Sequence, residues 1–229
     1  MNLPNAISAA RIAVSPLIAL LPLVPSPLWR AVGFALYIVS AVSDYFDGWL
    51  ARTRGLVTDL GKTLDPLADK LLLVATFIPM VVLQGKQGDF VAAFTAGALH
   101  IPPERAFTFP FVTWFGSFSL PWWVVAVVLG RELFMTVFRQ LAQGRGVVIA
   151  AIYPAKVKAV TQYIWVGAAY FWFAVRTYAE RDGWSGNRAW DFFAPLVSAI
   201  GVVSMWVSVG LAIASLAIYL RRYRALLTA

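Results

Sequence analysis

Six long apolar stretches recur along the chain, and short segments rich in charge, glycine or proline separate them. They cover about residues 13–23, 29–50, 61–83, 121–141, 154–175 and 192–219. A helix of roughly 20 mostly apolar residues is long enough to cross the hydrocarbon core of a bilayer. The pattern therefore predicts an all-α fold, a polytopic membrane protein with six transmembrane helices. The residues before Ala13 are expected to form a short N-terminal interfacial segment.

The longest connection, residues 84–120, mixes glycine, proline and charged residues with many aromatic ones. It is too polar to be a span, and aromatic side chains favour the membrane–water interface. We therefore expect an extended interfacial loop that can hold a short amphipathic helix. Since no internal repeat, low-complexity tract or linker divides the chain, residues 1–229 are expected to form a single domain.

The composition agrees with a membrane location. Apolar residues make up 60% of the 229 positions and charged residues only 13%, against roughly 25% charged in soluble domains. Cysteine is absent, which excludes disulfides and thiolate metal sites. The net charge of +8 is not gathered in runs apart from the apolar stretches. We therefore expect anionic membrane lipids as partners and no nucleic acid.

The distribution of Lys and Arg predicts the orientation. Six spans place both termini on one side, and 13 of the 19 Lys and Arg residues lie on that side or at the adjacent helix ends. Basic residues accumulate on the cytoplasmic side of membrane proteins. We therefore expect a multi-pass protein of the bacterial inner (cytoplasmic) membrane, with both termini in the cytoplasm.

Four aspartates stand where the second apolar stretch ends and the third begins: Asp44, Asp47, Asp65 and Asp69. Each buried Asp costs roughly 3 kcal/mol in a membrane span, so a charge partner is needed. The i,i+3 and i,i+4 spacings place each pair on one helix face. Oxygen ligands without His or Cys favour Mg²⁺ or Mn²⁺ over Zn²⁺, and two such ions would form a clamp for displacement at phosphorus.

Two other interpretations of these aspartates remain open. They could be solvated helix ends, or they could form the ion path of a cation transporter. A transporter would distribute ionisable groups through the membrane depth, whereas these four are predicted at one face. Near them, Gly48 and Gly61 leave room for a close backbone approach, and the guanidinium of Arg52 suits a diphosphate.

The pattern D-x2-D-G-x2-A-R-x8-G-x3-D-x3-D, complete from Asp44 to Asp69, resembles the signature of the CDP-alcohol phosphatidyltransferase family. The resemblance implies a six-helix membrane enzyme, usually a homodimer, that transfers a phosphatidyl group from a CDP-linked lipid to an alcohol and releases CMP. It further implies that Asp44, Asp47 and Asp65 are metal ligands. Asp69 would be both a ligand and the general base that takes the proton of the attacking hydroxyl.

The resemblance also suggests the residues that hold the two substrates. Residues at the CDP site would be Gly48, Ala51, Arg52, Gly61, Asn5 and Ser8. The segments at residues 4–11, 130–132 and 155–159 resemble the branch of the family that makes phosphatidylglycerophosphate. By that resemblance the donor is CDP-diacylglycerol and the acceptor is sn-glycerol 3-phosphate.

Four basic residues at the cytoplasmic ends of the fourth and fifth spans would bind the acceptor phosphate: Arg131, Arg139, Lys156 and Lys158. They could instead be topology signals whose charges extend to the interface. Because the signature does not specify the alcohol, phosphatidylglycerol, inositol phosphate and inositol remain alternative acceptors.

Overall fold

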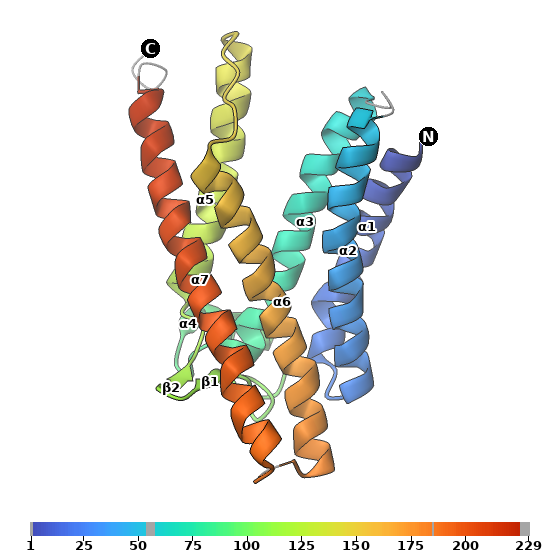
Figure 1. Ribbon diagram of the computed structural model, residues 1–229, viewed down its shortest axis with the longest axis vertical. Coiled ribbons are helices and arrows are strands. Elements are labelled where there is room, and N and C mark those ends of the chain that lie inside the picture. The colour runs from blue at the N-terminus through green and yellow to red at the C-terminus, as the bar shows by residue number, and fades with distance from the viewer. Residues whose placement is uncertain (1, 54–57, 185, 225–229) are drawn as a thin grey trace.

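Six long helices form an antiparallel bundle in the computed structural model, which describes residues 2–53, 58–184 and 186–224. The side chains at 45, 47–52, 59 and 62 are outside this description. The long helices are α1 (Leu3–Leu20), α2 (Pro27–Thr53), α3 (Asp59–Gln84), α5 (Trp122–Gly144), α6 (Tyr153–Asp182) and α7 (Arg188–Arg222). The start of α1 and the end of α7 lie at the same end of the bundle, here called the terminal end (Figure 1).

The six predicted helices are confirmed, but only three are confirmed as candidate spans. Within the described residues, Leu3–Leu23, Thr63–Gln84 and Arg188–Arg222 are long and apolar enough to cross a membrane. The helices α5 and α6 carry several ionisable residues, among them Arg131 and Lys158, that are buried inside the bundle. Their membrane crossing, like that of α2, stays a prediction.

The first helix differs from the prediction. A single continuous helix, α1, replaces the expected interfacial segment followed by a span at Ala13. The side chain of Asn2 caps this helix by accepting a hydrogen bond from the Asn5 amide at 3.1 Å, and Pro4 stands in its first turn. Both residue types favour a helix start, so the helix begins at Leu3. It ends in a short 3₁₀ turn, η1 (Leu21–Leu23), as the prolines near residue 25 predict.

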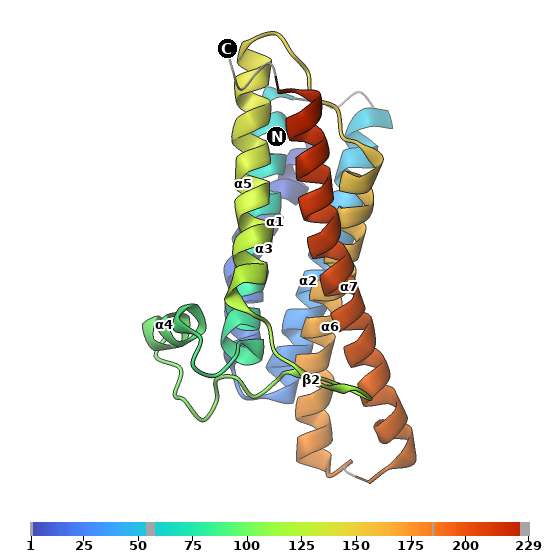
Figure 2. The same ribbon diagram turned by 90° about the vertical axis from the view of Figure 1, so that its left-hand side faces the viewer.

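The connection between α3 and α5 lies at the other end of the bundle, here called the hairpin end (Figure 2). It holds the predicted short helix, α4 (Phe90–Ala98), and an unpredicted hairpin of β1 (Phe111–Thr113) and β2 (Gly116–Phe118). The mostly helical structure agrees with the all-α prediction, to which this short antiparallel pair is a small addition. Amides of the connection donate to the last carbonyls of α3, for example Phe109 to Leu83 at 2.9 Å, which satisfies groups that a helix end leaves unpaired.

The bundle consists of two packed groups of helices. In one, α1 packs against α2 and α3; in the other, α7 packs against α5 and α6, and α2 joins the groups by packing on α6. Aromatic side chains fill the junction, where the ring of Tyr37 stacks on that of Tyr170 with centroids 5.4 Å apart. By contrast α3 and α5 meet only weakly, and the two groups diverge toward the terminal end (Figure 1).

Candidate active site

The first three helices meet at a cluster of polar side chains, here called the acidic junction: Ser8, Arg11, Asp44, Asp65 and Asp69. The Arg11 guanidinium of α1 donates to Asp44 Oδ1 of α2 at 2.5 Å and to Asp69 Oδ1 of α3 at 2.8 Å. The Ser8 hydroxyl donates to Asp65 Oδ1 at 2.5 Å. Three of the predicted aspartates are thus held by one face of α1, because Ser8 and Arg11 are three residues apart.

Burial differs across this junction. Arg11 is only 3% exposed and Ser8 is fully buried, whereas the Asp69 side chain is 50% exposed and that of Asp44 is 29% exposed. A buried cation needs an anionic partner, so Arg11 depends on these carboxylates. The carboxylates retain open faces on which a ligand can bind.

A second contact fixes the start of α3 against α1. Asn5 and Thr58 exchange side-chain hydrogen bonds of 2.9 and 3.1 Å, and Thr58 caps α3 by accepting from the Gly61 amide at 3.0 Å. A Cβ on Gly61 would lie 2.8 Å from Asn5 Oδ1, which is too close. Glycine at this position therefore lets α1 approach α3.

A cavity of about 550 Å³ opens beside the acidic junction, between α3, α5 and α6. Asp65 and Asp69 lie on its α3 wall, and Arg139 and Lys158 lie on the walls formed by α5 and α6. Acidic and basic side chains therefore face one space, although nearly 90 residues separate Asp69 from Lys158 in the chain.

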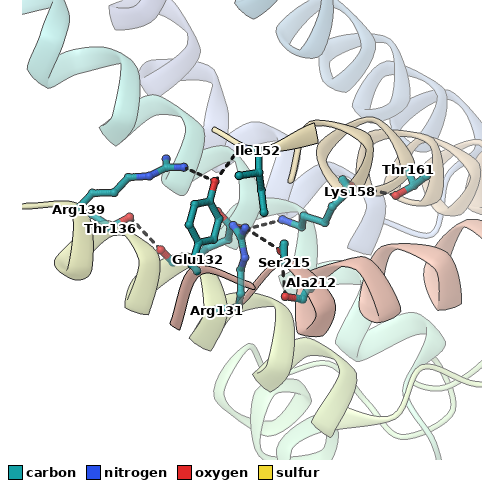
Figure 3. A network of polar contacts seen from close by, with 10 residues as sticks. Arg131, Glu132, Thr136, Arg139, Ile152, Lys158, Thr161, Ala212 and Ser215 are labelled. Atoms are coloured by element: carbon teal, nitrogen blue, oxygen red, sulfur yellow. Dashed lines mark hydrogen bonds and ion pairs between the residues drawn. The ribbon is translucent and has the colours of Figure 1, made fainter. Parts of the chain in front are cut away.

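A basic network joins α5, α6 and α7 beside this cavity (Figure 3), and Glu132, Arg139 and Lys158 of this network line the cavity. Its members are Arg131, Glu132, Arg139, Lys158, Ser215 and Tyr219. Glu132 Oε1 accepts hydrogen bonds from Lys158 Nζ at 2.5 Å and from Arg131 at 2.9 Å. Since Lys158 is only 4% exposed, this carboxylate stabilises its charge. The shared acceptor also connects α5 with α6.

The other members connect this network to α7. Arg131 donates to the Ser215 hydroxyl at 3.1 Å, and Arg139 donates to the Tyr219 hydroxyl at 3.3 Å. The same hydroxyl accepts from the Ile152 amide at 3.0 Å. Tyr219 therefore holds both Arg139 and the connection between α5 and α6.

The structure brings some predicted site residues together and separates others. Asp44, Asp65 and Asp69 meet at α1, and Asn5, Ser8 and Gly61 pack beside them. Lys158 and Arg139 line the cavity. Arg131 does not line it and instead donates to Ser215 of α7. Lys156 is exposed and outside the cavity lining. The side chains of Asp47, Gly48, Ala51 and Arg52 lie outside the described part of the chain.

Arg11, Glu132 and Tyr163 are site residues that the sequence predictions did not assign. Tyr163 of α6 lines the cavity and donates to Asp44 Oδ2 at 3.4 Å. For Arg11 a signal existed, because an arginine within an apolar helix is costly unless it has an anionic partner. Glu132 carried a similar signal as the one acid of its helix.

The donor set at the acidic junction suits a hard divalent cation. Asp44 and Asp69 present carboxylate oxygens to one cationic group, the Arg11 guanidinium, and carboxylate oxygens are the ligands that Mg²⁺ prefers. Among the described side chains no three His, Cys, Asp or Glu residues group closely enough to hold an ion. The fourth predicted ligand, Asp47, is not among those side chains. The carboxylate oxygens of the acidic junction are therefore of the kind that binds a divalent metal.

The fold and this cavity define an α-helical membrane enzyme whose site joins carboxylates to basic side chains. A family model described as CDP-alcohol phosphatidyltransferase matches residues 1–101 and 105–214. The chain belongs to the CDP-alcohol phosphatidyltransferase family.

Similar proteins carry one activity in their names. A Bacillus subtilis protein named CDP-diacylglycerol–glycerol-3-phosphate 3-phosphatidyltransferase is 33% identical over 179 residues, 73% of this chain and 75% of that protein. A Rickettsia bellii protein of the same name is 46% identical over 80 residues, 35% of this chain and 44% of that protein. An Arabidopsis thaliana protein, CDP-diacylglycerol–glycerol-3-phosphate 3-phosphatidyltransferase 1, is 27% identical over 227 residues, 97% of this chain and 62% of that protein.

Proposed function

We propose that the protein transfers the phosphatidyl group of CDP-diacylglycerol to sn-glycerol 3-phosphate, giving phosphatidylglycerophosphate and CMP. The observation that carries this proposal is the cavity itself, which has Asp69 on one wall and Arg139 and Lys158 on the others. A small acceptor with a hydroxyl at one end and a phosphate at the other matches this division of charge. The names of the relatives support the same donor and acceptor.

Asp69 is the proposed general base. Its half-exposed carboxylate lines the cavity, where it can take the proton of the attacking acceptor hydroxyl. The hydroxyl oxygen forms a bond to the phosphorus of the phosphatidyl group. The bond from that phosphorus to the oxygen shared with CMP breaks, and CMP leaves with the electron pair. Arg11 orients the base by donating to Oδ1.

Asp44, Asp47, Asp65 and Asp69 are the proposed ligands of Mg²⁺ or Mn²⁺, with two ions as the expected number. When bound, such ions neutralise negative charge on the phosphoryl oxygens and on the departing group. Ser8 supports this set by donating to Asp65, which leaves the second Asp65 oxygen for a ligand.

The acceptor phosphate is proposed to bind at Arg139 and Lys158. A guanidinium and an ammonium on two adjoining walls form charge-assisted hydrogen bonds with a phosphate dianion. Arg131 contributes indirectly, because it shares the carboxylate that holds Lys158. Lys156, which is exposed at the start of α6, would attract anionic substrates from solution rather than contact them in the cavity.

The CDP group is proposed to lie beside the start of α3, near Gly48, Ala51, Arg52 and Gly61. Asn5 and Ser8 are nearly fully buried and already hydrogen-bonded to α3 and its cap. Their part in CDP binding would therefore be to hold that wall in place.

The proposed setting is the cytoplasmic membrane of a bacterium, with the terminal end in the cytoplasm. The single domain would span the membrane six times and form a homodimer among anionic lipids. The lining residues of the cavity come mainly from the parts of α3, α5 and α6 nearer the terminal end, where a soluble acceptor and a lipid headgroup would meet.

Product identification tests this function. Purified protein in detergent receives CDP-diacylglycerol, Mg²⁺ and one acceptor at a time: sn-glycerol 3-phosphate, phosphatidylglycerol, inositol or inositol phosphate. We expect CMP release and a lipid of the mass of phosphatidylglycerophosphate with the first acceptor alone. Release of CMP with a different acceptor, and none with glycerol 3-phosphate, would refute the proposed acceptor. Omitting the divalent metal in the presence of a chelator should abolish turnover.

A further inference from the structure

The wall of the cavity that α6 forms contains a polar atom without a partner. Gln162 lines the cavity, and its amide oxygen is buried without a hydrogen bond in the described part of the chain. Buried polar groups are hydrogen-bonded in the great majority of cases, so an exception needs an explanation. Among the described residues that line this cavity, no other has such an atom.

Gln162 lies beside both chemistries of the cavity. It is four residues beyond Lys158, so both side chains project from the same face of α6, about 6 Å apart along the helix axis. Its neighbour Tyr163 reaches Asp44 of the acidic junction.

We infer that the Gln162 amide binds a hydroxyl of the acceptor other than the one that attacks. This inference rests on the proposed function, because it takes the acceptor to be a polyol phosphate. With the phosphate at Lys158 and the attacking hydroxyl at Asp69, the hydroxyl on the middle carbon lies between them. The terminal torsion of glutamine is broadly distributed, so the amide can turn its oxygen toward that hydroxyl and accept its hydrogen bond.

This arrangement makes Gln162 a specificity-determining residue. A site built to hydrogen-bond a substrate hydroxyl rejects an analogue that lacks it, because its own polar group then stays unpaired. The protein would therefore distinguish glycerol 3-phosphate from 3-hydroxypropyl phosphate, which has the same phosphate and the same terminal hydroxyl but no middle hydroxyl.

The test compares these two acceptors by CMP release with CDP-diacylglycerol and Mg²⁺. For the unaltered protein we expect kcat/KM to be at least tenfold higher with glycerol 3-phosphate. In Gln162→Leu that preference should fall to near unity, because glycerol 3-phosphate loses its advantage while the analogue is used as before. The matched control is Gln143→Leu, which removes an amide from an exposed side chain of the same cavity and should keep the full preference.

Thermal unfolding separates a binding role from a structural one. Replacing a side chain whose buried amide oxygen has no hydrogen bond by an apolar group of similar size is close to neutral, so Gln162→Leu should unfold no earlier than the unaltered protein. The inference is overturned if Gln162→Leu keeps the tenfold preference. It is also overturned if the unaltered protein uses both acceptors equally. Either result leaves the proposed function intact. No CMP release from either acceptor by the unaltered protein overturns the proposed function and this inference together.

Discussion

Two buried arginines at opposite ends of the bundle are held in different ways. Arg11, near the terminal end, donates to the carboxylates of Asp44 and Asp69. Arg30, near the hairpin end, is 5% exposed. It donates to the Pro22 carbonyl at 2.9 Å and to the Thr177 hydroxyl at 2.5 Å. Its guanidinium also lies 4.3 Å from the centre of the Phe109 ring.

The difference between the partners of the two arginines indicates that Arg30 serves packing and that Arg11 belongs to a site for chemistry. Backbone carbonyls, hydroxyls and aromatic faces stabilise a guanidinium without adding charge. Through such contacts Arg30 holds η1 against α6. The partners of Arg11 are charged and partly exposed, and Asp69 faces a cavity. Such groups can also bind a ligand. Activity should therefore depend on the terminal end, and the hairpin end should contribute only stability.

The largest effect is expected for Asp69→Asn. The amide keeps an oxygen for Arg11 but cannot take a proton, and loss of a general base typically lowers kcat by about 10²–10⁴-fold. The measurement is CMP release under saturating substrates, together with thermal unfolding, which should change little.

Asp89→Asn is the matched change at the hairpin end. Asp89 caps α4 by accepting from the Val91 and Ala92 amides and also accepts from the Trp122 amide at 3.1 Å. Because asparagine is also a good cap, kcat should stay within twofold. Equal losses of activity in the two variants would contradict the assignment of chemistry to the terminal end.

A second comparison replaces each buried arginine by methionine. Arg11→Met leaves two partly exposed carboxylates without their cation, which should cost less than the roughly 3 kcal/mol of a fully buried pair. Activity should fall at least tenfold, because Asp69 then loses the guanidinium that orients it. Arg30→Met removes two hydrogen bonds to neutral acceptors and should cost about 2 kcal/mol.

Denaturation midpoints and turnover at a temperature where both variants are folded check this pair. Arg30→Met should retain the turnover of the unaltered protein once the folded fraction is taken into account. If its kcat falls as far as that of Arg11→Met, the hairpin end also contributes to catalysis and the comparison fails.

The third effect is smaller and concerns Lys158 and Lys156. Lys158→Met should raise KM for glycerol 3-phosphate about tenfold, which corresponds to about 1.4 kcal/mol of lost binding, with less change in kcat. Lys156→Met should change KM less than threefold, because this side chain is outside the cavity lining. Initial rates at varied acceptor concentration measure both, and equal shifts would show a diffuse charge effect instead of a binding site.

The same lysines show what the sequence could and could not predict. Apolar stretches predict the six helices because their length and composition are strong signals, and the aspartate spacing predicts the acidic faces of α2 and α3. Residues two apart do not share a helix face, so Lys156 and Lys158 could not both face one cavity. Which of them faces inward depends on how α6 packs against α5, and that is a tertiary property.

Other features depended on contacts distant in sequence. The pairing of Arg11 with α2 and α3 becomes definite only when three helices are placed together. Three-residue strands are too short for an alternating pattern to predict, so β1 and β2 were missed. The partner of Lys158 lies 26 residues away on another helix, a distance that gives no local periodicity.

The smallest effect on activity is expected for alanine at two tightly packed glycines. A Cβ on Gly61 would lie 2.8 Å from Asn5 Oδ1, and one on Gly201 of α7 would lie 2.3 Å from Phe111 Cζ of the hairpin. Overpacking costs typically about 1–3 kcal/mol, while alanine gains up to about 1 kcal/mol of helix propensity over glycine. Gly201→Ala meets the closer contact and should be the less stable variant.

Activity should follow the opposite order. Gly61→Ala displaces Asn5 and the cap at Thr58, which tilts the start of α3. Asp65 and Asp69 then move relative to α1. Because small misplacements of reacting groups are costly, kcat/KM should fall about threefold to tenfold. Gly201→Ala moves a hairpin far from the cavity and should leave kcat/KM unchanged. Gly201→Ala would thus lower mainly stability and Gly61→Ala mainly activity, according to their positions in the bundle. If both lost activity in proportion to stability, position in the bundle would not decide function.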